Sequence, residues 1–348
     1  MPHNWNAFLQ QHGAHFDELD VQHFTQTSNF NAWDAGFLVS LSDLGLIALE
    51  GEQAAEFLHN QLTNDVKNLP LEQARLAAYC TPKGRILASM LLFRSETQIF
   101  LQMPQTILPG LLKRLKMFVM RSKATLLDAS DSKIVLGLGG KAASAALAPW
   151  FAELPAMPFG KTSNQYGDLI RMPDAFGVAC YQWLLDPALA QEVWPQLAAT
   201  LAEAPNRIWR LAAIDAGVPQ IVPVTQEKFV PQMINYELLG GVNFKKGCYP
   251  GQEIVARSQY LGKLKRRMRV AQVDGPFIDG VLPAAGQEVF SVSDPDQPCG
   301  MLVNAEANLN SGYRALVEIK TELLETEVHL GSLQGPRLHF GNLPYPVE

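Results

Sequence analysis

The stretch Lys246-Gly247-Cys248-Tyr249-Pro250-Gly251-Gln252-Glu253 sets a single thiol between a lysine and a turn that contains two glycines. Glycine permits backbone angles and close approaches that other residues do not, so Gly247 and Gly251 predict a tightly shaped loop. Pro250 fixes its own φ angle and suits the first turn of a helix, which we expect to run to about Tyr260. Residues 246–251, called the thiol loop below, therefore lead directly into a short helix.

Cys248 lies just ahead of this expected helix, for which Gly262 is the expected end. The positive end of the helix dipole and the ammonium group of Lys246 both favour a thiolate over a thiol. A free cysteine is also commonly a small buried hydrophobe, and Glu253 with Arg257 forms an ordinary helical pair at i and i+4. From the residues alone, a reactive thiol and a structural thiol both remain open.

The same stretch resembles the K-G-C-[aromatic]-x-G-Q-E signature of the YgfZ family of folate-binding proteins, and the match continues through residues 254–257. These proteins are relatives of the aminomethyltransferase, or T-protein, of the glycine cleavage system. Three further segments resemble the family: residues 59–65 (HNQLTND), residues 79–86 (YCTPKGRI) and the run over residues 210–235. The resemblance covers residues 40–300.

Length and composition indicate a globular protein of more than one domain. A chain of 348 residues is long enough for two or three domains, and its 47% apolar and 18% charged residues are not typical of disorder. No apolar run approaches the length of a membrane span, and the first six residues lack the pattern of a secretory signal peptide. The four cysteines form no C-x-x-C pair, which argues against a disulfide framework and against a self-contained zinc or iron–sulfur site. We therefore expect a protein of the reducing cytoplasm without a membrane partner.

Basic residues gather around the thiol loop and just after it, on a chain whose net charge is −6. Residues 245–269 contain one acid, Glu253, and eight basic residues, which are Lys245, Lys246, Arg257, Lys263, Lys265, Arg266, Arg267 and Arg269. Such a contrast steers anionic ligands, and both the glutamate tail of folate and RNA are of this kind. A solvated strand face explains the same alternation of residues. No spaced aromatics of an RNA-binding fingerprint occur nearby.

Hydrophobic periodicity predicts a strand–helix–strand–strand–helix order that occurs twice. In the first round, strands are expected at residues 44–49, 86–93 and 98–103, and helices at residues 52–63 and 108–119. In the second round, strands are expected at residues 133–138, 168–172 and 178–185, and helices at residues 141–151 and 187–202. The pattern indicates two α+β halves that face each other across a ligand cleft.

The two ends of the chain have patterns of their own. The aromatic residues Trp5, Phe8, Phe16 and Phe24 indicate a packed arm rather than a free tail. From Lys265 onward short strands alternate with turns and predict a small β-barrel, with strands at residues 265–273, 288–291, 301–304, 314–319 and 327–330. We therefore expect an α+β fold with domains at residues 1–130, 131–262 and 263–348.

The helix expected at residues 108–119 has one apolar face, which we interpret as packed in a core. Its members are Leu108, Leu111, Leu112, Leu115, Phe118 and Val119.

The resemblance implies the same layout, a duplicated, aminomethyltransferase-like folate-binding body with a C-terminal β-barrel, and tetrahydrofolate or a derivative as cofactor. In the aminomethyltransferases the turn that corresponds to residues 83–85 is followed by a pair of aspartates, one of which acts on the folate-bound amine. Here the corresponding residues are Ala88 and Ser89. General acid–base catalysis needs a titratable group within hydrogen-bond reach, so we do not expect the glycine-cleavage reaction, and enzymatic activity stays open.

Folate binding needs a flat apolar slot and a few fixed hydrogen-bond partners, which Asn, Gln and carboxylate side chains supply. The candidates are Asn64, Asp65, Asp215 and Gln232, with Arg85 near the glutamate tail. Asp215 precedes an Ala-Gly pair much as a glutamate does in the aminomethyltransferases. Caps and turns are the ordinary roles of Asp and Asn, and Arg85 equally fits a solvated strand start.

The resemblance implies a tetrahydrofolate-binding protein that supports the assembly or repair of iron–sulfur clusters and, through iron–sulfur enzymes, the modification of tRNA. Cys248 is the expected reactive thiol, as a redox group or as a transient cluster ligand shared with a partner, because clusters usually take four thiolates. Lys246 is expected to lower the pKa of Cys248, and Gln252 and Glu253 to orient a ligand or partner. The expected partners are iron–sulfur assembly proteins or enzymes, with tRNA as a further one.

Two other functions remain open. A folate-dependent one-carbon transferase or demethylase that acts on an amine would need Asp215 or Glu253 to replace the missing aspartates. An RNA-binding module would use the basic residues around the thiol loop, and its affinity would fall steeply with salt.

Overall fold

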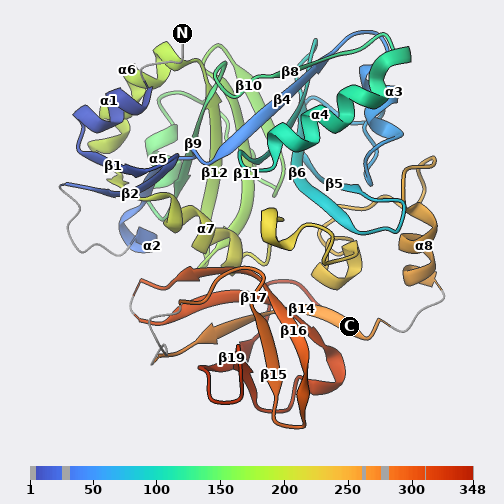
Figure 1. The fold of residues 1–348 in the computed structure, drawn as a ribbon. Coiled ribbons are helices and arrows are strands. Elements are labelled where there is room, and N and C mark those ends of the chain that lie inside the picture. Colours follow the sequence, from blue (N-terminus) through green and yellow to red (C-terminus); the bar gives the residue numbers. More distant parts are fainter. Residues whose placement is uncertain (1–4, 26–31, 261–263, 276–281, 310, 348) are drawn as a thin grey trace. The chain divides into compact units, whose positions relative to one another are not determined.

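The computed structural model describes residues 5–25, 32–260, 264–275, 282–309 and 311–347 (Figure 1). Two compact units share the chain, and each is built from segments that are far apart in sequence. Unit 1 consists of Met1–Ala54, Leu69–Arg75 and Leu91–Ala212, and unit 2 consists of Ala55–Asn68, Leu76–Met90 and Ala213–Glu348. The three domain boundaries expected from the sequence stay a prediction.

A six-stranded sheet carries the aromatic core of unit 1. Its order is β10 (Lys161–Asn164), β11 (Gly167–Ala175), β12 (Val178–Leu185), β9 (Ile134–Gly139), β3 (Phe37–Ser40) and β13 (Ala202–Glu203). Neighbouring strands are antiparallel except for β13, which runs parallel to β3. Residues of the sheet share one cluster of buried apolar side chains with α1 (Trp5–Gln11), α5 (Ala143–Leu147) and α6 (Pro187–Ala198).

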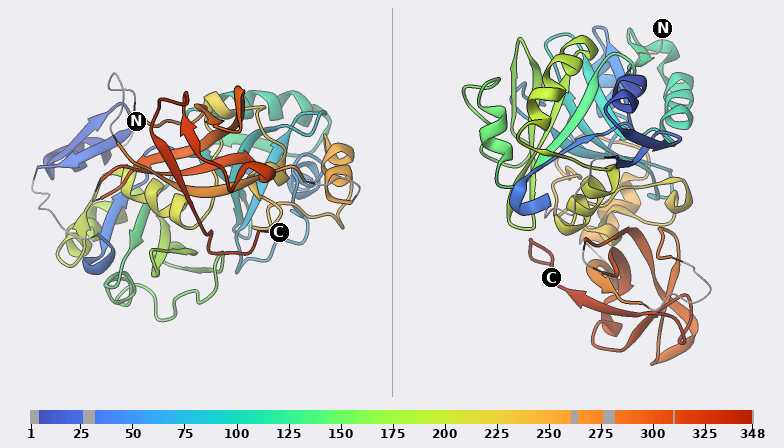
Figure 2. Two further views of the ribbon diagram at one scale, coloured as in Figure 1. Left: turned by 90° about the horizontal axis from the view of Figure 1, so that it is seen from below. Right: turned by 90° about the vertical axis from the view of Figure 1, so that its left-hand side faces the viewer.

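Residues 5–25 form a packed arm on unit 1. Strands β1 (Ala14–Asp17) and β2 (Asp20–Phe24) make a hairpin, and α1 lies beside α6 (Figures 1 and 2). The ring of Trp5 lies 5.6 Å from that of Trp194, and the ring of Phe24 lies 6.0 Å from the same side chain. The predicted arm is thus confirmed for the described residues. The short helix α2 (Ala32–Ala35) then leads into β3.

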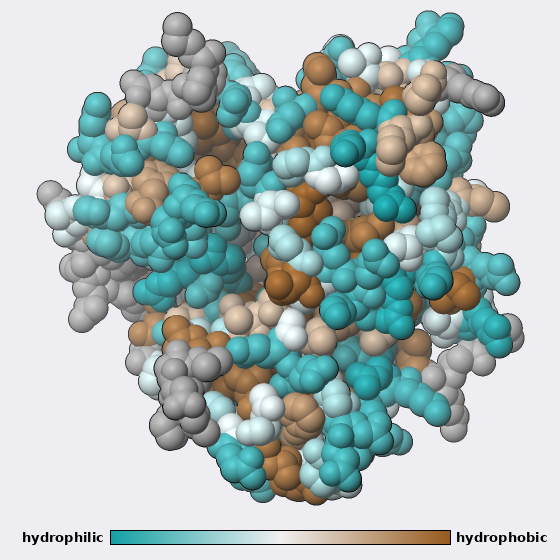
Figure 3. Space-filling view, in the orientation of Figure 1, coloured by the Kyte–Doolittle hydropathy of each residue, from teal (hydrophilic) through white to brown (hydrophobic). Residues whose placement is uncertain are grey.

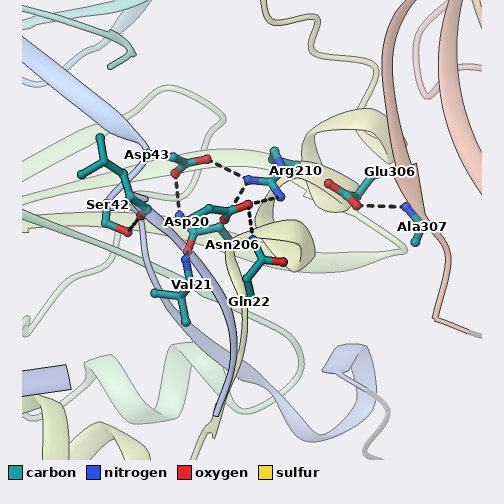
Figure 4. Close-up of polar contacts among 10 residues, drawn as sticks. Asp20, Val21, Gln22, Ser42, Asp43, Asn206, Arg210, Glu306 and Ala307 are labelled. Atoms are coloured by element: carbon teal, nitrogen blue, oxygen red, sulfur yellow. Dashed lines mark hydrogen bonds and ion pairs between the residues drawn. The ribbon is translucent and has the colours of Figure 1, made fainter. Parts of the chain in front are cut away.

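A polar cluster joins the arm to the β3–β4 turn and to α7 (Asn206–Asp215) within unit 1 (Figure 4). The guanidinium group of Arg210 donates to Asp20 at 2.9 and 3.1 Å and to Asp43 at 3.0 Å, and Asn206 Nδ2 donates to Asp43 at 2.7 Å. Burial raises the pKa of Asp43, although the charge of Arg210 opposes that shift. Arg210, one of the residues that resemble the family, therefore belongs to the framework of this unit.

Unit 1 also contains a run of antiparallel strands ordered β6-β7-β4-β8, in which β8 is the edge strand. These are residues 91–94 of β6 (Ile86–Arg94), β7 (Ile99–Pro104), β4 (Leu44–Glu50) and β8 (Thr125–Asp128). Next to them lies α4 (Leu108–Phe118), which continues as the 3₁₀ turn η1 (Val119–Arg121). The positions of β4, β6, β7 and α4 agree with the expected elements, whereas β8 was not predicted.

The apolar face of α4 is covered only in part. Leu108, Leu111 and Leu115 are buried, as expected, but Phe118 is 55% exposed. The assignment of Phe118 to a core was therefore wrong, because the apolar stripe extends one turn beyond the covered part of the helix.

Unit 2 ends in a closed barrel of six strands, which confirms the predicted small β-barrel, for which five strands were expected (Figures 1 and 2). Its order is β14 (Arg266–Val273), β17 (Tyr313–Lys320), β16 (Asp294–Ala307), β15 (Glu288–Ser291), β18 (Val328–Leu330) and β19 (Arg337–Gly341), with η5 (Thr321–Leu323) after β17. The pairs are antiparallel, and β14 with β19 closes the ring. Strand β19 was not predicted, because only Leu338 and Phe340 contribute to the barrel core, too few for a clear alternation.

The rest of unit 2 includes the segments that contact the thiol loop. It comprises α3 (Ala54–His59), β5 (Arg75–Cys80) with the start of β6, the 3₁₀ turns η2 (Pro223–Thr225) and η3 (Pro231–Ile234), and α8 (Gln252–Tyr260). The helix expected at residues 52–63 is shorter, because the residues after His59 bond to β5. Thr63 N donates to Ala78 O at 2.9 Å, and Thr63 Oγ1 accepts from Ala78 N at 2.8 Å. Among the described residues, no helix is long and apolar enough to cross a membrane.

Candidate functional site

The thiol loop packs against the turn that follows β5, and two glycines make this contact possible. Gly251 has a φ angle of +83°, and a Cβ atom there would lie 2.4 Å from Thr81 O and 2.7 Å from Gly84 Cα. Gly84 has a φ angle of +71°, and its Cβ atom would lie 3.1 Å from Ile254 Cβ. The prediction of a tightly shaped loop is therefore confirmed at Gly251, and the loop brings two of the family-like segments together.

Lys246 fastens the thiol loop to the segment that follows α3. Its ammonium group donates to the carbonyl oxygens of His59 and Leu62, the latter at 2.8 Å. It also lies 4.7 Å from the centre of the Tyr249 ring, a cation–π contact. The side chain of Lys246 thus holds the thiol loop against residues 59–65, which form one side of the site.

The charge of Lys246 has no paired anion in the described part of the chain. Burial lowers the pKa of Lys246 to about 8, although the charges of Asp65 and Cys248 favour its protonated form. Among the residues that the structure describes, no carboxylate lies within ion-pair distance of its ammonium group. The ammonium group of Lys246 is therefore a partly desolvated cation. Cys248 is close enough to interact with it electrostatically.

His59 lies beside the thiol loop and was not among the predicted site residues. Its Nε2 atom would lie 3.8 Å from a Cβ atom placed on Gly247, and its Nδ1 atom lies 3.1 Å from Asp65 Oδ1. The latter contact is at ion-pair distance without the alignment of a hydrogen bond. Burial lowers the pKa of His59, and the charge of Lys246 acts in the same direction. Its place at the head of the HNQLTND segment was the signal that could have identified it.

Cys248 is the exposed cysteine of the chain, whereas Cys80, Cys180 and Cys299 are buried. Burial raises the pKa of Cys80 to about 12, which keeps this thiol protonated. In the described part of the chain, no three side chains of His, Cys, Asp or Glu gather in a way that could hold a metal ion. Cys248 is thus the one cysteine positioned to meet a second molecule without unfolding.

The first residues of α8 follow the thiol loop toward solvent. Gln252 is half-buried, whereas Glu253 is exposed. The helix begins at Gln252 and ends at Tyr260, close to the predicted bounds, whereas its expected end at Gly262 lies outside the described residues, as does Lys263. Both predicted residues thus follow closely after Cys248 in the chain, and Glu253 is accessible to a second molecule.

Two of the folate candidates, Asn64 and Asp65, form a turn next to the thiol loop. Asn64 Nδ2 donates to Leu76 O and to Gly240 O, both at 2.7 Å, and Asn64 Oδ1 accepts from Asp65 N at 2.8 Å. Asp65 accepts from the backbone and side chain of Asn68 at 3.2 and 2.8 Å. These side chains therefore have structural partners of the kind expected for a turn.

The other three candidates lie at different places in unit 2. Gln232 is fully buried and donates from Nε2 to Val255 O at 2.7 Å, which leaves Oε1 without a hydrogen-bond partner among the described atoms. Arg85 donates to Lys228 O at 2.5 Å. Asp215 pairs with Arg314 of β17 at 2.5 Å. Of the five candidates, Asn64 and Asp65 are thus brought together with the thiol loop, and Asp215 is engaged by the barrel.

The positions where the aminomethyltransferases carry aspartates are filled by structural residues. Ala88 is fully buried, and Ser89 Oγ accepts a hydrogen bond from Ile221 N at 2.9 Å. No group there can move a proton at neutral pH.

The basic residues around the thiol loop do not form one surface. Arg267 is 6% exposed, pairs with Glu237 and donates to Gln232 O at 3.0 Å, and Arg266 pairs with Glu318 at 3.0 Å. The interpretation as a solvated strand face was therefore wrong for Arg267. Lys265 is exposed, as are Lys245 and Arg257.

The α+β body, the closed barrel and the cysteine loop at their junction in sequence define the class, proteins with the fold of the glycine cleavage T-protein. The family model "GCVT N-terminal domain" matches residues 14–172. The crystal structure of aminomethyltransferase T from Bartonella henselae superposes with a TM-score of 0.78 at 18% identity, over 98% of this chain and 96% of that one.

Sequence relatives identify the family to which the chain belongs within this class. The tRNA-modifying protein YgfZ of Yersinia enterocolitica is 34% identical over 66% of this chain and 69% of its own length. The protein of the same name from Colwellia psychrerythraea is 34% identical over 69% of this chain and 74% of its own. The chain belongs to the YgfZ family.

Proposed function

We propose that this chain is a tRNA-modifying protein that binds tetrahydrofolate and supports the assembly or repair of the iron–sulfur clusters on which tRNA-modifying enzymes depend, in the cytoplasm. The names of its relatives support the link to tRNA, and the T-protein fold is consistent with a folate ligand. The observation that carries the proposal is the exposed thiol of Cys248, on a loop with two separate anchors and close in sequence to Lys246, a lysine with no ion pair among the described residues.

The role of Cys248 follows from how many ligands a cluster needs. Iron–sulfur clusters usually take four thiolates, whereas this site offers one. Cys248 therefore acts as a shared, transient ligand of a cluster in transit or as a redox thiol, and an iron–sulfur assembly protein or enzyme supplies the other ligands. Lys246 favours the thiolate through its charge, and Gln252 and Glu253 contact the incoming partner.

The residues available for folate fit the ligand in part. A pterin ring needs fixed hydrogen-bond partners in a buried setting, and Gln232 Oε1 is a buried acceptor with no partner among the described residues. Asn64, Asp65, Arg85 and Asp215 already have partners within unit 2, so they would bind folate with their remaining lone pairs and N–H groups. Bound tetrahydrofolate would supply a carrier for one-carbon groups.

The two alternatives have less support. A one-carbon transferase or demethylase would need a carboxylate in place of Ala88 and Ser89, and Asp215, one substitute, is already paired with Arg314. An RNA-binding module would need the basic residues at the surface, and Arg267 is buried against Glu237.

A strain that lacks its own YgfZ protein tests the proposal. Cys248→Ala should restore thiolated and methylthiolated tRNA nucleosides, measured by mass spectrometry, at least about tenfold less than the wild type does. Cys180→Ala, which removes a buried thiol, is the matched control and should restore them nearly fully. Full restoration by Cys248→Ala would remove the thiol from the mechanism.

Calorimetric titration with tetrahydrofolate tests the cofactor separately. Binding by both the wild type and Cys248→Ala would place the folate site apart from the thiol. Gln232→Leu should then weaken binding, because it removes the buried acceptor. Absence of binding to the wild type would refute the folate part and leave the thiol part standing.

A further inference from the structure

The C-terminal end of α4 and the turn after it expose large apolar side chains on unit 1. Met117 and Phe118 are 58% and 55% exposed, Met120 is 84% exposed, and Leu127 on the neighbouring strand β8 is 48% exposed. Light-brown residues at the upper right of Figure 3 lie over this end of α4. Single exposed apolar residues are ordinary, but several together mark a binding surface.

Two of these side chains, Met117 and Met120, line a shallow groove. The groove has a volume of about 530 Å³, and its lining includes Leu112, Met117 and Met120 from α4 and η1 and Asp128 from β8. Thioether side chains are flexible and polarisable, so they adapt to the apolar side chains of a peptide. Phosphates and sugars of RNA gain little from such a lining.

One side of the groove is the edge strand β8. In the described sheet β8 pairs with β4 and ends the strand order. Alternate residues of an edge strand direct their N–H and C=O groups away from the sheet, where they are available to an added strand. Many peptide-binding domains bind an extended segment in this way and select it through pockets for alternate side chains.

The charges around the groove favour an acidic segment. Lys113 and Lys116 line it, and neither forms an ion pair among the described residues. The carboxylate of Asp128 is already engaged by Ser130, which donates from N at 3.0 Å and from Oγ at 2.6 Å. On a chain of net charge −6, this is a local positive rim that attracts carboxylates.

We propose that the groove between α4 and β8 docks an extended, acidic peptide segment of a partner protein. The segment adds a strand to β8, inserts apolar side chains against Met117 and Met120, and places carboxylates at Lys113 and Lys116. This surface is independent of Cys248 and of folate, so it holds whether or not the proposed function does.

A random peptide library displayed on phage, panned against the purified protein, tests the site. Enriched sequences should combine alternate apolar residues with Asp or Glu. A synthetic peptide of that sequence should lose about tenfold or more in affinity for Met120→Glu, measured by fluorescence anisotropy. Met157→Glu is the matched control, because Met157 is also exposed, at 72%, and lies outside the groove. Amide hydrogen exchange at residues 125–128 should slow when the peptide binds, as strand addition requires.

Three outcomes would overturn the proposal. The first is that no acidic and apolar sequence is enriched, and the second is equal affinity of the peptide for Met120→Glu and the wild type. The third is that an unmodified tRNA transcript, rather than a peptide, loses its binding to Met120→Glu, which would make the surface an RNA site. Circular dichroism of both variants checks that each is folded.

Discussion

Lys246 and Arg267 belong to the same basic stretch of sequence and the same unit, yet the structure treats their charges in opposite ways. Arg267 is buried and pairs with Glu237, so the carboxylate of Glu237 compensates its charge. Lys246 meets neutral carbonyl oxygens and forms no ion pair among the described residues. The paired cation supports the fold, whereas the charge of Lys246 stays available to a neighbouring group or a ligand. A count of charges along the sequence does not separate the two.

The largest effect is expected where the paired cation loses its partner. Glu237→Gln leaves the charge of Arg267 buried and uncompensated, so it should lower the free energy of unfolding by about 3–5 kcal/mol. Urea unfolding measures the loss. The matched control is Glu327→Gln, because Glu327 contacts His329 and Arg337 at the surface of the barrel. There the loss should be about 1 kcal/mol or less.

A double variant tests whether the loss of stability comes from the uncompensated charge of Arg267. Glu237→Gln with Arg267→Met removes the buried charge together with its partner, so most of the lost stability should return. If Glu237→Gln costs no more than Glu327→Gln, Arg267 is not held by its ion pair and the contrast with Lys246 fails.

The anchor of the thiol loop gives the next effect. Gly251→Ala places a Cβ atom 2.4 Å from Thr81 O at a φ angle of +83°, and should cost about 2–3 kcal/mol. Gly240→Ala is the matched control, since Gly240 has a similar φ angle of +72° but open space around its Cβ position. It should cost only about 1 kcal/mol. Equal midpoints of urea unfolding for the two variants would mean that the loop does not depend on this contact.

The partly desolvated amine of Lys246 should influence the pH dependence of stability. The pKa of Lys246 is about 8 in the folded protein, whereas an unfolded lysine titrates near about 10.4. Between these pH values the unfolded state binds more protons, so stability rises with pH, by about 1–2 kcal/mol after allowance for solvent around the half-exposed amine. Lys246→Met should lack this rise when urea unfolding is followed from pH 7 to 10.5, and a rise of the same size in both proteins would refute the assignment.

The smallest effect concerns the thiol itself. If the charge of Lys246 favours the thiolate of Cys248, Lys246→Met should slow alkylation of Cys248 by iodoacetamide about threefold at neutral pH. Lys245→Met, at an exposed lysine next to it, is the control and should change the rate less. The reverse order would assign the electrostatic role to Lys245.

Elements with strong local signals could be predicted from the sequence. The helix after the thiol loop, the alternating strands and the turn-rich barrel all appear close to their expected positions, because local periodicity and turn residues determined them. The failures depended on distant partners. The hydrogen bonds between Thr63 and Ala78 on β5 determine that α3 ends at His59. No local pattern at residues 60–63 predicts these bonds.

The same limit applies to the site. The position of Cys248 could be predicted because the loop residues are contiguous, and its exposure agrees with a reactive role. The burial of Arg267 could not, since Glu237, which compensates its charge, lies 30 residues away. His59 was not predicted although it begins the HNQLTND segment, because its proximity to Gly247 exists only after folding. The assignment of folate contacts stays a prediction.

The division of unit 2 over the chain has a consequence for its synthesis. The carbonyl group of His59 and the ammonium group of Lys246 are separated by 187 residues, so a ribosome that adds roughly 5–20 residues per second delivers the lysine on the order of 10–40 s after the histidine. During that time residues 55–68 and 76–90 have emerged without the segments that cover them, and chaperones would shield their apolar side chains. We expect unit 1 to fold first, and the thiol to be set in place only after nearly three quarters of the protein has been made.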